Sequence, residues 1–76
     1  MTNYLTKTAR KKLARQAATK ANGGTRASNH QVGIAGKTID RLVDENPKRF
    51  IDFSNVRYCT PRHDEIINAT AEALTE

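Results

Sequence analysis

The sequence predicts a small, mainly α-helical domain with one short β-hairpin. Apolar residues recur at helical spacing before residue 47 and after residue 62, whereas residues 50–59 are rich in β-branched and aromatic side chains. The 76 residues leave room for one domain, which buries about 60% of the surface that its unfolded chain exposes. A small all-α helical bundle is the alternative that these patterns leave open.

Residues 6–21 are predicted to form the first helix, because they are good helix formers with apolar residues on one face. These residues recur at every fourth position: Leu5, Ala9, Leu13 and Ala17. The helix should end at Asn22-Gly23-Gly24, since Asn and Gly tolerate the left-handed backbone of a helix C-cap. Only two residues of the apolar stripe are large. We therefore expect residues 1–22 to dock loosely on residues 23–76 of a single domain, or to become ordered when their charges are neutralised.

Residues 25–46 are predicted to form two helices separated by a turn. Thr25 can cap a short helix that runs to about Val32, and Gly33 stops it. The second helix runs from about residue 36 to residue 46, because the proline at position 47 biases the residue before it away from helical backbone. Its apolar positions face inward: Ile39, Leu42 and Val43.

Residues 50–53 and 56–59 are predicted to be the two strands of the hairpin, since Ser54-Asn55 between them are typical turn residues. A last helix should follow, with Thr60 as its N-cap and Pro61 as its first residue. The acidic side chains of its first turn suit the helix dipole there: Asp64 and Glu65.

The charges of the chain are unevenly distributed. All eight acidic residues fall at or after Asp40, whereas the first thirty-nine residues carry eight of the thirteen basic ones. With a pI of about 9.8, this asymmetry indicates a polyanionic partner, most often nucleic acid. Two other readings remain open: the basic half pairs with the acidic half of its own chain, or it is simply a solvated face.

The predicted order of elements is that of a winged helix-turn-helix. Residues 32–42, Val-Gly-Ile-Ala-Gly-Lys-Thr-Ile-Asp-Arg-Leu, resemble the core of the helix-turn-helix family, in which a glycine at the turn is flanked by apolar residues. The continuation to the last helix resembles small excisionase-like and MerR-like DNA-binding proteins of phages and mobile elements. Residues 24–43 also resemble phage lysogeny activators. An ordinary helical hairpin is the alternative.

This resemblance implies a cytoplasmic regulator of transcription or recombination that binds double-stranded DNA sequence-specifically, as a homodimer or higher homo-oligomer. The residues expected to reach base edges in the major groove are Lys37, Thr38 and Arg41. For Arg41, an intrahelical pair with Glu45 is an equal alternative. The residues expected to contact phosphates, with Arg57 in the wing, are Lys7, Lys11, Lys12, Arg15, Arg26 and Arg57.

Catalytic, cofactor and metal sites are not expected. Residues 33–38 look like the end of a phosphate-binding P-loop, but Gln31 stands where that motif needs glycine. His30, Cys59 and His63 lack the paired spacing of a zinc site. A single cysteine indicates a reduced thiol in a cytoplasmic-type compartment, and no apolar run approaches the ~20 residues of a membrane span.

Two other functions fit the same sequence. A small phage-type inhibitor could place its basic half in an acidic groove of a host protein. Alternatively, the first helix could bind structured RNA as an arginine-rich segment.

Overall fold

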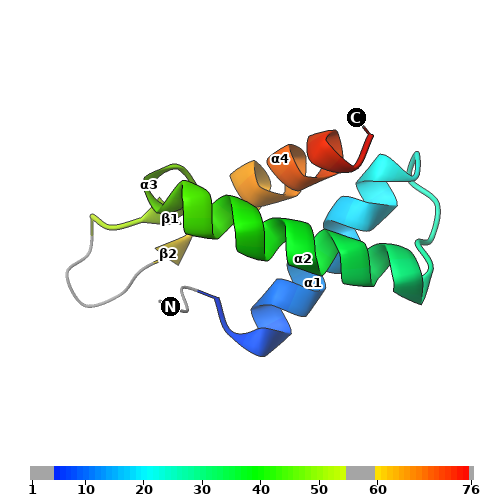
Figure 1. Ribbon diagram of the computed structural model, residues 1–76, viewed down its shortest axis with the longest axis horizontal. Helices are drawn as coiled ribbons and strands as arrows, with labels where there is room; N and C mark the ends of the chain where they lie inside the picture. Colours follow the sequence, from blue (N-terminus) through cyan, green and yellow to red (C-terminus); the bar gives the residue numbers. More distant parts are fainter. Residues whose placement is uncertain (1–4, 55–59, 76) are drawn as a thin grey trace.

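The computed structural model describes residues 5–54 and 60–75, which form a mainly helical domain with a two-stranded antiparallel hairpin (Figure 1). This confirms the predicted fold class at that level. The elements, in chain order, are α1 (Lys7–Ala21), α2 (Asn29–Glu45), α3 (Pro47–Phe50), β1 (Ile51–Asp52), β2 (Thr60–Pro61) and α4 (His63–Thr75).

Helix α1 ends at the predicted residue and begins one residue later than predicted. The Thr6 hydroxyl accepts a hydrogen bond from the Ala9 N–H at 3.1 Å and caps its start. At its end, Gly23 and Gly24 adopt φ values of 73° and 90°, the left-handed backbone that favours glycine. The Gly24 N–H donates to the Thr19 carbonyl at 2.9 Å, which satisfies one carbonyl of the last turn.

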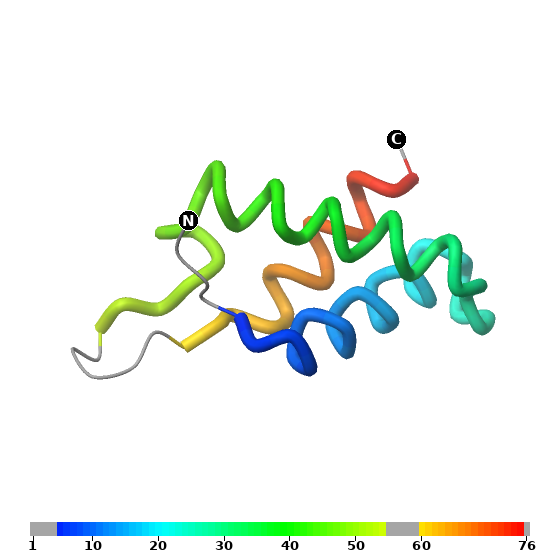
Figure 2. The backbone as a smooth tube through the Cα atoms, turned by 60° about the horizontal axis from the view of Figure 1, so that its bottom comes forward, coloured from blue at the N-terminus to red at the C-terminus, as the bar shows by residue number. Residues whose placement is uncertain are grey.

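One side of α1 is packed into the core, which differs from the loose docking expected from its two large apolar residues. Its buried residues are Leu13, Ala14, Ala17 and Ala18. Three of these four are alanines, and such small side chains let neighbouring helices approach closely. Helices α1, α2 and α4 pack pairwise around the core (Figure 2). The largest fully buried side chains are Phe50, Ile39, Ile51, Ile66 and Thr70.

The predicted turn at Gly33 is wrong, because residues 29–45 form one continuous helix. Its N-cap is Ser28 rather than Thr25. The Ser28 hydroxyl accepts a hydrogen bond from the Gln31 N–H, and the Gln31 side chain accepts one from the Ser28 N–H. This capping box starts the helix, and a single interior glycine costs only about 1 kcal/mol, which is too little to break it. The helix-turn-helix bend is therefore absent from this part of the chain.

The substitution Gly33→Ala tests the continuity of α2. Gly33 is exposed, has no positive φ, and a Cβ atom built there meets nothing within 4 Å. We expect Gly33→Ala to stabilise the protein by about 0.5–1 kcal/mol, because alanine loses less backbone entropy than glycine in a helix. Chemical denaturation followed by circular dichroism measures the change. A loss of stability would instead indicate a turn that needs glycine.

The hairpin is present, but its strands differ from those predicted. Ile51 pairs with Pro61 and Asp52 pairs with Thr60. Thr60 and Pro61 therefore extend the sheet instead of starting the last helix, and the Arg62 N–H continues the pairing by donating to the Phe50 carbonyl at 2.7 Å. The predicted second strand at residues 56–59 lies outside the described residues.

Two consequences follow for the neighbouring helices. Helix α4 begins at His63, and it carries Asp64 and Glu65 in its first turn as predicted. Pro47 starts the short helix α3, which brings Phe50 into the core.

Among residues 5–54 and 60–75, no helix combines the length and the apolar character that crossing a bilayer requires.

Candidate nucleic-acid interface

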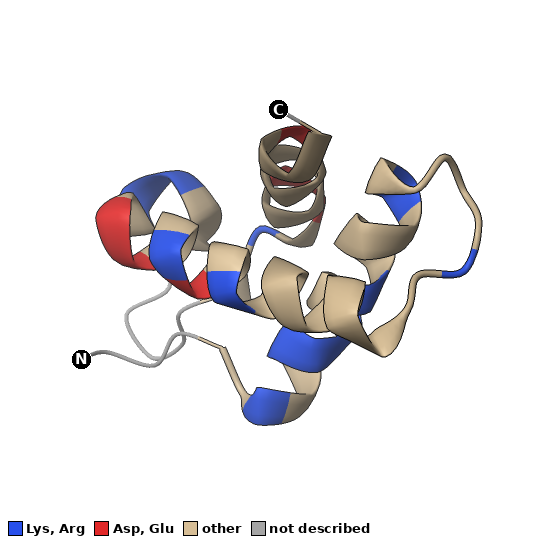
Figure 3. Ribbon diagram, turned by 45° about the vertical axis from the view of Figure 1, so that its right-hand side comes forward, with Lys and Arg blue, Asp and Glu red and all other residues tan. Residues whose placement is uncertain are grey.

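The side of α1 that faces away from the core carries a cluster of cations. We call this cluster the α1 basic face and define it as Lys7, Lys11, Lys12 and Arg15. All four side chains are exposed, and successive turns of the helix bring them to one side because three- and four-residue spacings fall on one face. Figure 3 shows Lys and Arg along α1 without an acidic residue among them. Thr8, Lys11, Lys12 and Arg15 line a shallow depression on this face.

No carboxylate of residues 5–54 and 60–75 forms an ion pair with the α1 basic face. Within the described residues, the two ion pairs join Arg10 to Asp40 at 3.2 Å and Arg49 to Glu65 at 2.9 Å. Glu65 of α4 thus pairs with α3 rather than with α1. On the other side of α1, the Lys20 ammonium donates to the Asn68 side-chain carbonyl of α4. Among the residues that the structure describes, Arg10 is therefore the one cation of α1 that pairs with a carboxylate.

Arg10 lies at the junction between α1 and α2. A Cβ atom built on Gly36 would lie 3.5 Å from its guanidinium, an ordinary van der Waals contact, so Arg10 packs directly over this residue of α2. Its Nε–H donates to both oxygens of Asp40, at 3.2 and 3.3 Å. The two side chains are 37% and 56% exposed, so this pair contributes at most about 1 kcal/mol. Its larger effect is to offset the charge of Asp40, the carboxylate nearest to α1 along the chain.

A second hollow opens where α1, the connecting loop and the start of α2 meet. Arg15 lines both this hollow and the depression on α1, which makes the two surfaces adjacent. The residues that line it are Arg15, Thr19, Gly24, Arg26, Ala27, Asn29 and Val32. The structure thereby brings the predicted phosphate contact Arg26 next to the α1 basic face.

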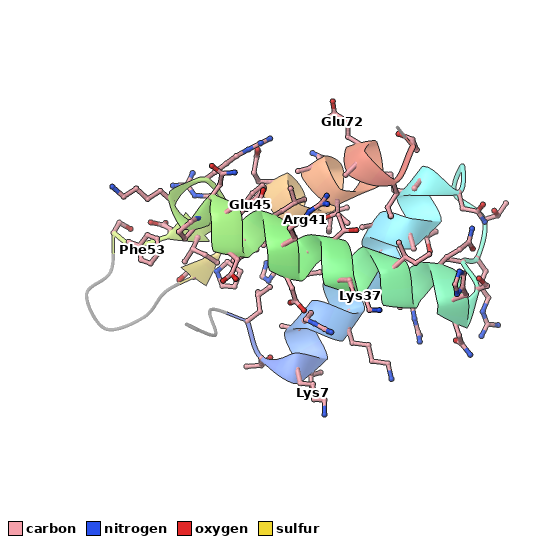
Figure 4. The ribbon with its side chains drawn as sticks, viewed as in Figure 1. Lys7, Lys37, Arg41, Glu45, Phe53 and Glu72 are labelled. Atoms are coloured by element: carbon pink, nitrogen blue, oxygen red, sulfur yellow. The ribbon has the colours of Figure 1, made fainter. Side chains whose placement is uncertain are left out.

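The predicted base contacts lie in the middle of α2 and not at the start of a separate helix. Lys37 and Arg41 are exposed on α2, as Figure 4 shows, and neither takes part in the ion pairs of the described residues. The predicted pair between Arg41 and Glu45 is therefore not formed here. Thr38 is half-buried, and its hydroxyl donates to the Ile34 carbonyl of its own helix at 2.9 Å. Arg57 lies outside the described residues.

The remaining carboxylates of the described residues are distant from the α1 basic face in the sequence: they lie on the second half of α2, at the hairpin and on α4. Hydrogen bonds from the Ser54 side chain and backbone N–H lower the pKa of the Asp52 carboxyl. Within residues 5–54 and 60–75, no three His, Asp or Glu side chains come together in a way that could hold a metal ion.

Sequence reasoning missed the polar side chains between the cations. Thr8 and Thr19 line the two hollows, and Asn29 lies at the start of α2 beside Arg26. The signal was present in the spacing, since Thr8 lies four residues before Lys12 and Thr19 lies four residues after Arg15.

No protein-family model matches this chain, and neither a curated protein nor a solved structure is significantly similar to it.

Proposed function

We propose that this protein binds double-stranded DNA through the α1 basic face, extended by Arg26 in the neighbouring hollow. One observation carries the proposal: four exposed cations lie along a helix that is packed into the core, and none of them pairs with a carboxylate among the described residues. A surface of this kind attracts phosphates and gains affinity by releasing their counterions.

The dimensions of α1 suit this role. An α-helix with its side chains is about 10–12 Å wide, and the major groove of B-DNA is about 12 Å wide. Helix α1 has fifteen residues and is therefore about 22 Å long. The α1 basic face can contact the phosphates that border the groove, while the exposed Gln16 carries an amide that is suited to adenine.

Sequence-specific regulation of transcription or recombination is the further part of this proposal. Lys37 and Arg41 are the candidates for base contacts on α2, because both are exposed and without ion pairs in the described part of the chain. With so few candidate base contacts, a specific site would normally need two copies of the protein on adjacent half-sites.

A salt titration tests the proposal. For the intact protein and a fluorescent duplex, we expect the logarithm of the association constant to fall linearly with the logarithm of the salt concentration. Four or five phosphate contacts give a slope of about −4. Fluorescence anisotropy between 50 and 200 mM salt, a range over which such a slope is readily resolved, measures it.

Three competitors sharpen this experiment. A scrambled duplex separates specific from general DNA binding, and a structured RNA that displaces the duplex would favour the RNA alternative. Recovery of one stoichiometric host protein from a nuclease-treated lysate, without duplex binding at low salt, would reject the proposal and favour the inhibitor alternative.

A further inference from the structure

The hollow between α1 and the start of α2 has a composition unlike that of the open α1 basic face. Arg15 and Arg26 come from different elements and line the same concave surface, whose other lining residues include no carboxylate. Neither arginine takes part in the ion pairs of the described residues. Two guanidinium groups that share a concavity can both donate to one tetrahedral oxyanion, which single lysines on a convex helix cannot do.

Hydrogen bonds fix the loop that carries Arg26. The Asn22 side-chain amide donates to the Thr25 hydroxyl at 2.7 Å and to the Arg26 carbonyl at 3.4 Å. The Thr25 hydroxyl is also 2.8 Å from the Asn22 carbonyl. These contacts hold the backbone at residue 26 against the end of α1, where Arg15 and Arg26 line the same hollow.

Small and polar residues complete the surface. Gly24 has φ of 90° and open space where a side chain would lie, which leaves its backbone accessible from the hollow. Thr19 and Asn29 add groups that can hydrogen-bond to phosphate oxygens. The first turn of α2 has no acidic residue, so the positive end of its dipole adds to the attraction of the two arginines.

We infer that this hollow is a phosphate-binding pocket and that it anchors one backbone phosphate of the bound DNA, with Arg15 and Arg26 as the two principal donors. The inference rests on the proposed function for the identity of the ligand. It goes further by dividing the cations into two classes. Lys7, Lys11 and Lys12 contact phosphates as exposed point charges, whereas the two arginines bind a phosphate at one fixed point.

Inorganic phosphate is the probe for the pocket itself. In a titration of the ¹⁵N-labelled protein at constant ionic strength, we expect the amide signals of Gly24, Ala27 and Asn29 to shift together and to saturate, with chloride as the reference salt. A dissociation constant on the order of 1–10 mM is expected for a single small anion. Arg15→Gln with Arg26→Gln should weaken this binding at least about tenfold.

The matched control is Lys11→Gln with Lys12→Gln, which removes the same two charges from the neighbouring surface. This control should leave the phosphate shifts at residues 24–29 in place. Against duplex DNA, the double arginine variant should lose at least about five times more affinity than the double lysine variant. Arg15→Lys with Arg26→Lys retains both charges and should recover only part of that loss, because lysine lacks the planar fork of donors.

The outcomes separate the pocket from the proposed function. Equal losses of DNA affinity in the two double glutamine variants would overturn the pocket and leave general binding by charge intact. Phosphate shifts that never saturate, or that spread evenly along α1, would also overturn it. Saturable phosphate binding in a protein that fails to bind duplex at low salt would contradict the proposed function, and with it the DNA phosphate as the ligand, while the anion pocket would stand.

Discussion

Replacing Ile39 with alanine should lower the free energy of unfolding by about 2–5 kcal/mol, the range measured for truncation of a fully buried isoleucine or leucine. Ile39 is 0% exposed, and it belongs to the core cluster that α1, α2 and α4 share. Domains of this kind have about 5–15 kcal/mol of stability in total, so the variant should lose a large part of it. A thermal melt followed by far-ultraviolet circular dichroism should show a midpoint at least about 10 °C lower.

Ile34→Ala provides a matched control on the same helix. Ile34 is 44% exposed, so its truncation removes much less buried apolar surface than truncation of Ile39 does. We expect this control to change stability by less than about 1 kcal/mol, helped by the higher helix propensity of alanine. Equal losses of stability in the two variants would mean that the side of α2 that carries Ile39 does not face the core.

Reversing two charges of the α1 basic face should largely abolish DNA binding. Lys11→Glu with Lys12→Glu removes two phosphate contacts and replaces them with two repulsions, while both positions are exposed and outside the core. At about 1.4 kcal/mol for each reversed charge, the affinity falls about a hundredfold. The magnitude of the salt slope should fall by about two, because each phosphate contact contributes about 0.9 to it. Fluorescence anisotropy with one duplex at several salt concentrations measures both quantities.

Lys48→Glu with Arg62→Glu changes the net charge by the same amount at a different place. Lys48 lies on α3 and Arg62 lies directly before α4, and both are exposed. If binding follows the location of the charges, this control retains most of the affinity of the unmodified protein. If both variants lose affinity equally, net charge governs the attraction and the α1 basic face is not the binding surface.

The first helix and the body of the last helix could be predicted from local signals. Thr6 as N-cap and Gly23-Gly24 in left-handed backbone set the ends of α1 through contacts within a few residues. Asp64 and Glu65 lie in the first turn of α4 for the same local reason. Such signals depend little on the rest of the molecule, which explains why they can be read from the chain.

The middle of the chain depends on competition between signals, which the sequence does not resolve by itself. Gly33 reads as a turn residue, but the capping box at Ser28 and Gln31 and the buried positions after it favour a continuous helix. Thr60 and Pro61 read as a helix start, but pairing with residues 51 and 52 draws them into the sheet. The α1 basic face could be read from helical spacing. The hollow beside Arg15 could not, because it forms only when the loop returns residue 26 to the end of α1.

The burial of the inner side of α1 has a thermodynamic consequence for any ligand of its outer side. Basic peptides that are disordered in isolation must wind into a helix as they bind nucleic acid, at a cost of about 1–2 kcal/mol for each residue ordered. Here Leu13, Ala14, Ala17 and Ala18 hold the helix wound in the unliganded protein. Association therefore requires no gain in helicity. The favourable entropy of the displaced salt ions contributes fully to the affinity, because none of it has to offset the cost of forming a helix.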